Sequence, residues 1–231
     1  MKILPVVILA GGLGTRLIAV AGATPKVLIP ILGKPFLAWK LDALIKQGVT
    51  EVYLLLGSGA DQVRDFLAGY KTALRIITYT DGENLLGTAG AIRKYLDRLP
   101  EAFILTFGDN LLDFNLQELS QAYFTEKKSV MVCTSYKEPE ENFNVQISGT
   151  FVYKYDKRYN SDCSFMDYGY SVLELNNFKE LQLHQAVDLE KVIQELVVQQ
   201  KLIALTTSQE YFEIGTPEGL ERTINWLSRD E

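Results

Sequence analysis

A glycine-rich loop with two nearby cations follows the first apolar stretch of the chain. Residues 11–17 read GGLGTRL, and Pro25 and Lys26 come shortly afterwards. Three glycines let backbone N–H groups approach an anion closely, and Arg16 and Lys26 add positive charge. The alternative is a tight turn beside two solvated cations. A Walker A loop is excluded because no Gly-Lys-Ser/Thr follows, and the dinucleotide fingerprint is poor because Leu17 stands where its third glycine belongs.

Two later segments could complete an anion site. Residues 107–110 (FGDN) end an apolar stretch with a carboxylate, Asp109. Mg²⁺ prefers one or two carboxylates together with phosphate oxygens and water. Residues 86–90 (LGTAG) place glycines at the start of an expected helix, where free N–H groups bind anions and polar groups. Each segment taken alone is equally typical of an ordinary turn.

The sequence disfavours several other kinds of site and of protein. Cys133 and Cys163 lie far apart, so a Cys/His zinc site is excluded, and two lone thiols fit a reducing cytosol. The only histidine, His184, lies among polar residues and is expected at the surface, which disfavours serine-hydrolase and Cys–His mechanisms. A net charge of -6 disfavours a protein that coats nucleic acid or anionic membrane, and no apolar stretch is long enough for a membrane helix. We expect a cytoplasmic protein.

The first half of the chain alternates buried strands with amphipathic helices. This rhythm is typical of a mostly parallel sheet covered by helices on both faces, in which ligands bind at the carboxyl ends of the strands. Strands are expected at 6–10, 52–56, 74–79, 103–107 and 130–134, and helices from 35 to before 48, at 61–67, 89–96 and 116–124.

The rhythm changes after about residue 137. A hairpin around Ser148-Gly149 is expected, followed by a strand at 172–175, a helix over 189–197 capped by Asp188, and a strand at 203–207. Thr216-Pro217-Glu218 is typical of a helix start. The 231 residues are interpreted as one α/β domain, 1–231, with halves of about 1–136 and 137–231.

These motifs together resemble a known family. Residues 9–17 (LAGGLGTRL) with Pro25-Lys26 look like the signature loop of the sugar-1-phosphate nucleotidylyltransferases, and 86–90 and Gly108-Asp109 follow in the family's order. The matches continue with 155–157 (YDK), similar to a sugar-phosphate element, 213–217 (EIGTP), similar to the closing motif, and 165–170 (FMDYGY), similar to a short mannose- and heptose-directed branch. The resemblance spans essentially the whole chain. It implies a Rossmann-like, mostly parallel (mixed) sheet flanked by helices on both faces, of the nucleotide-diphospho-sugar transferase type.

The resemblance also assigns a role to each matching position. The residues expected to bind the nucleotide are Leu9, Gly11, Gly12, Gly14, Thr15, Gly87 and Thr88. The residues expected to act in catalysis are Arg16, Lys26 and Asp109. Asp109 and Glu213 are expected to share Mg²⁺. The expected contacts to the sugar phosphate and its hydroxyls are Asp156, Lys157 and Asp167, so the second half of the domain would bind the sugar.

The implied reaction is Mg²⁺-dependent transfer of a nucleotidyl group from an NTP to a sugar 1-phosphate, giving an NDP-sugar and pyrophosphate by in-line attack. GTP with a mannose- or heptose-type sugar is favoured by the branch resemblance. The nucleophile is already ionised at neutral pH, so positioning and charge neutralisation suffice without a general base. The expected partners are these two substrates, with neither nucleic acid nor membrane. The oligomeric state stays open, a homodimer being one option.

The sequence departs from the family pattern at three places. Glu213 stands where many relatives carry Asp, Asn110 replaces a smaller serine or threonine, and Glu83 lies one place late before Leu-Gly-Thr. These departures bear on metal geometry and base choice. Two alternatives therefore stay open: a CTP-dependent cytidylyltransferase acting on a phosphorylated alcohol such as phosphocholine, and a catalytically silent nucleotide-binding homologue.

Overall fold

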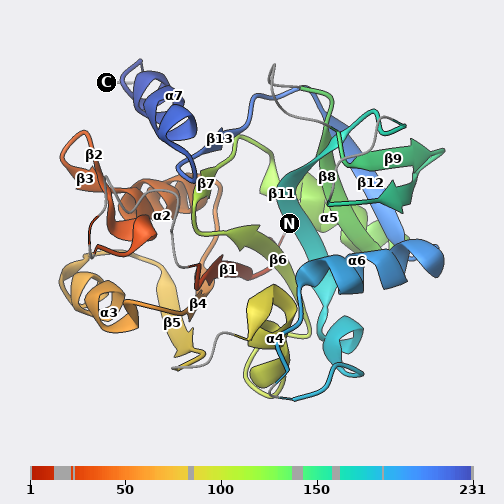
Figure 1. The fold of residues 1–231 in the computed structure, drawn as a ribbon, viewed down its shortest axis with the longest axis horizontal. Coiled ribbons are helices and arrows are strands. Elements are labelled where there is room, and N and C mark those ends of the chain that lie inside the picture. The colour runs from red at the N-terminus through yellow and green to blue at the C-terminus, as the bar shows by residue number, and fades with distance from the viewer. Residues whose placement is uncertain are drawn as a thin grey trace.

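A nine-stranded mixed sheet runs through the molecule (Figure 1). The computed structural model describes residues 2–12, 22, 24–82, 86–136, 143–157, 162–183 and 185–229. The strands, in their order across the sheet, are β5 (Arg75–Thr80), β4 (Glu51–Leu56), β1 (Val6–Ala10), β6 (Ala102–Phe107), β11 (Met166–Glu174), β8 (Ser129–Thr134), β12 (Leu202–Thr207), β10 (Phe151–Tyr155) and β9 (Val145–Ser148).

The sheet changes character between its two halves. β5, β4, β1 and β6 are mutually parallel, as the apolar β-branched runs predict. β11 then pairs antiparallel with both β6 and β8, and β10 with both β12 and β9, while β8 and β12 are parallel. The expected mixed α/β sheet is confirmed, with the parallel pairings concentrated in the first half.

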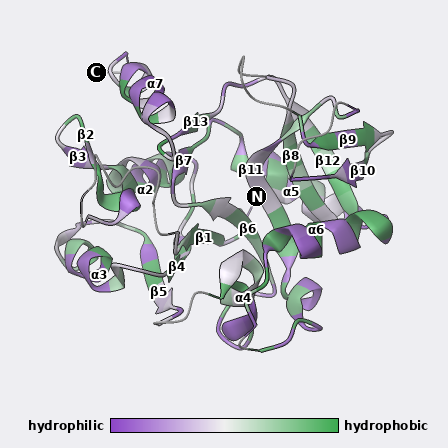
Figure 2. Cartoon of the chain, in the orientation of Figure 1, coloured by the Kyte–Doolittle hydropathy of each residue, from purple (hydrophilic) through white to green (hydrophobic). Residues whose placement is uncertain are grey.

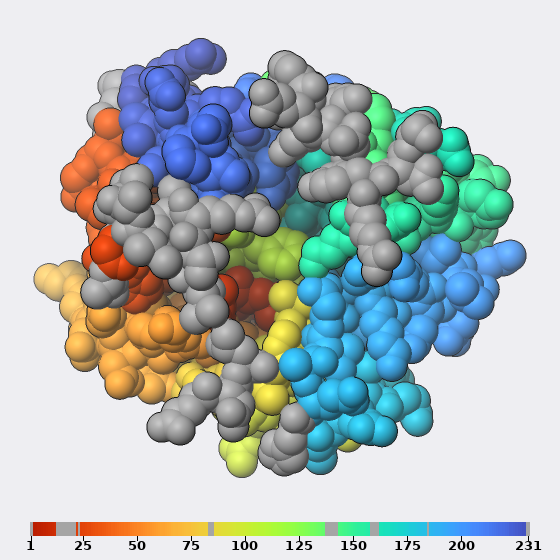
Figure 3. Space-filling view, in the orientation of Figure 1, coloured from red at the N-terminus to blue at the C-terminus, as the bar shows by residue number. Residues whose placement is uncertain are grey.

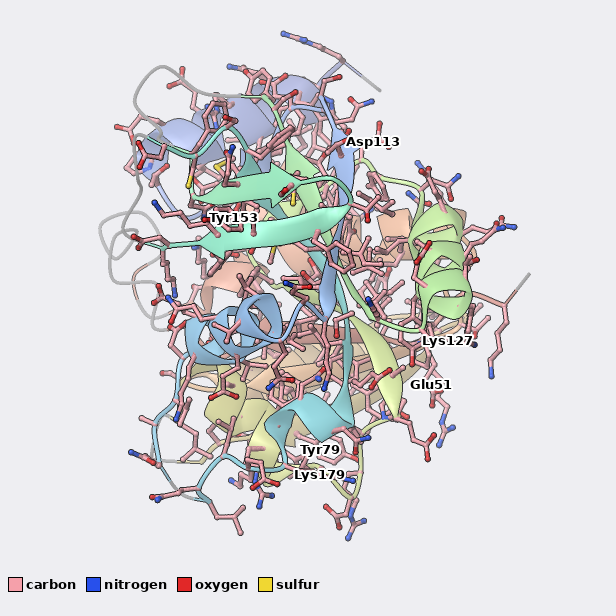
Figure 4. The ribbon with its side chains drawn as sticks, turned by 90° about the vertical axis from the view of Figure 1, so that its right-hand side faces the viewer. Glu51, Tyr79, Asp113, Lys127, Tyr153 and Lys179 are labelled. Carbon is pink, nitrogen blue, oxygen red and sulfur yellow. The ribbon has the colours of Figure 1, made fainter. Side chains whose placement is uncertain are left out.

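Helices cover both faces of the sheet, as predicted. The core on one face is formed with α4 (Gly87–Lys94), the 3₁₀ helix η3 (Leu175–Phe178) and α6 (Leu189–Val198). The core on the other face is formed with α2 (Phe36–Lys46), α3 (Ala60–Gly69) and α5 (Leu116–Glu126). Figure 4 shows α6 and α5 on opposite sides of the sheet, with Tyr79 and Tyr153 towards its two ends. In Figure 2, β1 and β6 are mostly hydrophobic, whereas α6 carries hydrophilic residues outward.

A small third cluster lies beside the main sheet, and the sequence did not predict most of it. Its short elements are the pair β2 (Pro30–Ile31) and β3 (Lys34–Pro35) and the pair β7 (Asn110–Leu111) and β13 (Phe212–Glu213), whereas η2 (Lys26–Leu28) packs through Val27 and Leu28 in the core of α2, α3 and α5. Helix α7 (Pro217–Leu227) packs here through Leu220 and Leu227 against Ile214 and Leu111. This cluster places β7 and β13 immediately beyond the end of β6.

The two predicted helix caps and the hairpin are confirmed, whereas the helix expected at 89–96 spans Gly87–Lys94. Asp188 caps α6 by accepting from Glu190 N–H, and Thr216 caps α7 by accepting from Gly219 N–H. β11 begins at Met166, earlier than the strand expected at 172–175, because its pairing with β8 continues past an irregularity between Asp167 and Ser171. His184 lies outside the described residues. Within the described ranges, no helix is both long and apolar enough to cross a membrane.

Candidate functional site

A pocket of about 290 Å³ opens at the carboxyl ends of the four parallel strands. It is lined by Leu9–Gly12 at the end of β1, by Leu55 and Ser58 around the end of β4, and by Phe107–Asp109 at the end of β6, with α4 along one side. Figure 3 shows a hollow in the middle of this face, bordered by atoms of β1, of the end of β6 and of α4. The predicted residues Leu9, Gly11, Gly12, Lys26, Gly87, Thr88 and Asp109 all line it.

One end of the pocket carries a close pair of opposite charges. Lys26, at the start of η2, donates from Nζ to Asp109 Oδ2 at 2.6 Å. The Lys26 side chain is 15% exposed and the Asp109 side chain is 37% exposed. The pair therefore faces the pocket, and most of the Lys26 side chain is covered by the protein. The structure brings together two residues that are 83 positions apart in the sequence, as the prediction of a shared site requires.

Glu213 lies beside this pair on β13. Its Oε1 accepts from Thr216 Oγ1 at 2.7 Å and its Oε2 accepts from Gly215 N–H, so the carboxylate sits at the N-terminus of α7. A Cβ atom at Gly215 would clash with Glu213 Oε2 and lie 2.9 Å from Lys26 Nζ. The side chains of Glu213 and Lys26 therefore converge on the same glycine, and the longer glutamate reaches the helix terminus that favours negative charge.

The opposite end of the pocket is built around the start of α4. Gly87 has a φ of +71°, and a Cβ there would lie 2.6 Å from Val187 O, so no other residue fits without moving the chain before α6. Thr88 Oγ1 accepts from Leu189 N–H at 2.7 Å. Since a hydroxyl has one hydrogen and two lone pairs, Thr88 keeps its hydrogen and one lone pair for a ligand. Both residues thus join α4 to α6 and also line the pocket.

The structure adds Asp81 to this end, a residue that the sequence prediction missed. Asp81 follows β5 and lines the pocket, and Leu86 N–H donates to its Oδ2 at 3.4 Å. Partial burial raises its pKa, against the opposing effects of that hydrogen bond and of Lys94. Lys94 Nζ also donates to the carbonyl oxygen of Asp81 at 3.0 Å, which fixes the strand end. The available signal was an acidic residue two positions after the strand expected at 74–79.

The sugar-side residues predicted from the resemblance lie elsewhere. Lys157, after β10, donates from Nζ to both carboxylate oxygens of Asp188, at 3.0 and 2.9 Å, and both side chains are about half exposed. Burial would raise the pKa of Asp188, but the Glu190 N–H and Lys157 together lower it. Asp156 N–H donates to Asn144 O at 3.0 Å. Neither Asp156 nor Lys157 lines the pocket.

Asp167, on β11, is partly buried between these regions. Its Oδ1 accepts from Gly169 N–H at 2.9 Å, and Tyr155 Oη donates to Oδ2 at 3.4 Å. Burial raises the pKa of Asp167 to about 6, opposed by those two hydrogen bonds and by the charge of Lys157. The structure therefore links Asp167 with Lys157 electrostatically. Gly14, Thr15 and Arg16 lie outside the described residues, as does Glu83.

The two predicted metal carboxylates have the right chemistry for Mg²⁺. Asp109 and Glu213 flank Lys26, and Mg²⁺ prefers one or two carboxylates with phosphate oxygens completing its shell. β7 and β13 hold them in register, because Glu213 pairs with Asn110, the residue after Asp109. In the described part of the chain, no group of three or more His, Cys, Asp or Glu side chains is placed to hold a metal. The donor set thus fits a metal that arrives with phosphate oxygens.

Comparisons with known proteins define the class. The chain belongs to the nucleotidyl transferase family, whose sequence model matches residues 5–149. It is therefore a nucleotidyltransferase, as the resemblance of its motifs predicts.

Three proteins illustrate which members of the family the chain is similar to. The chain is 27% identical over 214 residues to D-glycero-alpha-D-manno-heptose 1-phosphate guanylyltransferase of Campylobacter jejuni, covering 92% of this chain and 95% of that protein. It is 32% identical over 139 residues to mannose-1-phosphate guanylyltransferase catalytic subunit beta of Drosophila pseudoobscura pseudoobscura, covering 58% of this chain and 38% of the relative. Its fold matches the crystal structure of HddC from Yersinia pseudotuberculosis with a TM-score of 0.83, at 24% identity over 97% of this chain and 99% of that one.

Proposed function

We propose that this enzyme transfers a nucleotidyl group from an NTP, with GTP favoured, to a sugar 1-phosphate of the mannose or heptose type, in the presence of Mg²⁺. The observation that carries the proposal is the polarity of the pocket. One end carries Lys26 and Asp109, with Glu213 beside them on β13, and the other is lined by Leu55, Ala91 and the start of α4. The names of the guanylyltransferase relatives support the choice of nucleotide and sugar.

The dimensions of the pocket suit a nucleoside triphosphate. Asp81 follows β5 and Asp109 follows β6, and three strand spacings separate β5 from β6. At about 4.8 Å per spacing, the two ends lie roughly 14 Å apart. A triphosphate can thus extend from the apolar end to the charged end. The base would then lie beside Gly87 and Thr88, with the phosphates near Lys26.

Asp81 supports the preference for guanine. A carboxylate accepts hydrogen bonds only, so it favours a base edge that presents donors. Guanine presents two adjacent donors, N1–H and the exocyclic amine, which a carboxylate can accept together. Asp81 lies at the apolar end of the pocket, where such hydrogen bonds are strengthened by the low dielectric.

The chain's own groups supply positioning and charge neutralisation. The sugar phosphate oxygen attacks the α-phosphorus in line, the bond to the β-phosphate breaks, and pyrophosphate departs with that bonding pair. Because the attacking oxygen is already ionised at neutral pH, no side chain has to remove a proton. Lys26 would exchange Asp109 for an α-phosphate oxygen, which holds the reacting phosphorus and offsets its charge.

The metal would be held by Asp109 and Glu213, with Mg²⁺ neutralising phosphate charge when it is bound. Arg16, Gly14 and Thr15 are expected to hold the departing phosphates, and Asp156, Lys157 and Asp167 the sugar phosphate and hydroxyls. Lys157 would reach that phosphate by exchanging its present partner, Asp188.

Pyrophosphate release over a grid of substrates tests the proposal. Five NTPs are combined with a panel of sugar 1-phosphates, with and without Mg²⁺. We expect release with GTP and a mannose- or heptose-type sugar, and none after chelation of the metal. Turnover of CTP with phosphocholine in the same assay would favour a cytidylyltransferase. Nucleotide binding by calorimetry with no turnover anywhere in the grid would favour a silent homologue.

A further inference from the structure

Lys40 is a lysine buried on the sheet-facing side of α2. Its side chain is 1% exposed, and its neighbours Leu37, Leu41 and Leu44 on that side are buried as well. A charged group in such a place is costly unless acceptors surround it. Burial lowers the pKa of Lys40 to about 7, against the opposing charge of Asp109. Lys40 is thus an unusual residue directly beneath the charged end of the pocket.

Within the described ranges, the hydrogen-bond acceptors of Lys40 all lie on the segment 106–110. Its Nζ donates to Asn110 O and to Asn110 Oδ1, each at 2.8 Å, and to Thr106 Oγ1 at 3.4 Å. Thr106 in turn donates its hydroxyl hydrogen to Asn110 Oδ1 at 3.1 Å. An ammonium group has three N–H donors, and these three acceptors satisfy all of them. Lys40 therefore holds the segment that carries Asp109.

Asn110 connects Lys40 with both candidate metal carboxylates. It follows Asp109 in the chain, and it pairs with Glu213 between β7 and β13. Next to that pair, Ile214 N–H donates to Asp109 O at 2.8 Å. A change in the position of Asn110 is thus transmitted to Asp109 and Glu213 together.

Lys40 also sets the orientation of the Asn110 amide. Because lysine only donates, the amide oxygen must face Lys40, and Nδ2 faces Gly169. Nδ2 is buried and has no acceptor within the described residues. An unpaired buried donor is costly, so the presence of Asn110 at this position is explained by the acceptor that its amide oxygen offers to Lys40. The shorter side chain of a serine would not reach as far towards Lys40.

We propose that Lys40 and Asn110 form a positioning pair that sets the spacing of the Asp109 and Glu213 carboxylates, and thereby the affinity of the site for a divalent cation. This inference rests on the proposed Mg²⁺-dependent function. Neither residue touches substrate or metal; both act through the segment they hold. The departure at Asn110 is then a consequence of the buried lysine.

Mn²⁺ binding by electron paramagnetic resonance tests the pair without turnover. The loss of the free Mn²⁺ signal is followed during titration of the protein–GTP complex, with no sugar phosphate present, and is compared with the loss caused by the same GTP without protein, because GTP itself chelates Mn²⁺. The variants are Lys40→Met, Asn110→Ser and the double variant. The matched control is Lys34→Met, because Lys34, on β3 just before α2, pairs with Asp42 instead. Melting curves and the KM and kcat for GTP at saturating Mg²⁺ accompany each titration.

We expect each single variant to weaken Mn²⁺ binding by about tenfold, as loss of a group that orients metal ligands does. The double variant should bind Mn²⁺ no more weakly than the single variant with the lower affinity. KM for GTP should stay near the wild-type value in every variant, and the Lys34→Met control should bind Mn²⁺ as the wild type does. A folded Lys40→Met protein with wild-type Mn²⁺ binding and only a lower melting temperature overturns the inference. If Lys40→Met does not fold, Asn110→Ser decides in the same way. Wild-type protein that removes no more free Mn²⁺ than the same GTP removes without protein contradicts the metal proposal itself, and this inference with it.

Discussion

The two charged regions, one around Asp109 and one around Lys157, differ in how their charges are held. Around Asp109, hydrogen bonds from the protein hold the two carboxylates in place. Lys40 binds the 106–110 segment that carries Asp109, and the N-terminus of α7 binds Glu213. Around Lys157, the main contact is an ion pair with Asp188 in which both side chains are about half exposed. Exposed ion pairs contribute little to stability and exchange partners readily.

This difference indicates a division of labour. Groups that must stabilise charge at the reacting phosphorus work best when they are already in place, because no reorganisation is then needed during the reaction. Groups that capture a substrate from solution can be held by a weak contact that the substrate replaces. We therefore expect substitutions near Asp109 to affect kcat and substitutions near Lys157 to affect KM.

The largest effect is expected from Lys26→Ala. Loss of a donor that offsets charge in the transition state typically costs about 3–4 kcal/mol, so kcat should fall roughly 10²–10³-fold. The fold should persist, because a partly exposed ion pair contributes about 1 kcal/mol or less. Steady-state kinetics and circular dichroism on the same preparation check this. Lys34→Ala, which removes a different ion pair near α2, is the control; equal losses in both variants would contradict the assigned role.

A smaller effect, on binding, is expected from Lys157→Ala. A hydrogen bond to a charged group is worth about 1.5–3 kcal/mol, so KM for the sugar 1-phosphate should rise about tenfold or more while KM for GTP stays unchanged. Initial-rate measurements with each substrate varied in turn separate the two constants. Lys154→Ala on β10, whose Nζ lies 3.8 Å from Asp162, is the matched control. An unchanged KM for the sugar 1-phosphate would show that its phosphate binds elsewhere. A fall in kcat alone would contradict the expectation that substitutions near Lys157 affect KM and those near Asp109 affect kcat.

The apolar end of the pocket can be examined through Asp81→Asn. ITP lacks the exocyclic amine of GTP, so wild-type enzyme should prefer GTP over ITP. Replacing the carboxylate by an amide should reduce that preference by about tenfold, since about one charge-assisted hydrogen bond is lost. The ratio of kcat/KM values for the two nucleotides measures it. Asp97→Asn, at an exposed carboxylate paired with Arg98, should leave the ratio alone; an unaltered ratio in Asp81→Asn removes this residue from base recognition.

The sequence predicted the regular elements well because their signal is local. Apolar β-branched runs and the caps Asp188 and Thr216 carry it within a few residues. The two-residue strands β7 and β13 could not be predicted, because their pairing joins segments about 100 residues apart and has no periodicity of its own. They nevertheless decide where Asp109 and Glu213 meet.

The same distinction applies to individual site residues. Motif resemblance pointed to Lys26 and Asp109, and the structure places them in contact. Lys40 had a visible sequence signal, a lysine on the apolar face shared by Leu37, Leu41 and Leu44. Its role depended on acceptors 66 and 70 positions away, which only the folded chain brings into contact with it.

The smallest effect concerns Asp167, which lies between the two regions. Its folded pKa of about 6 exceeds the ordinary value of 3.8, so between these values the folded state binds more protons than the unfolded state. Stability contributed by this group is therefore greatest at low pH and falls as the pH rises to about 6. From pH 5.5 to pH 7 the loss should be about 1 kcal/mol, or roughly 2–4 °C in melting temperature. Asp167→Asn should flatten this part of the melting profile relative to wild type. Parallel profiles for the two proteins would show that the carboxyl group is solvated as freely as Lys157, and would assign Asp167 to the exposed region of the comparison.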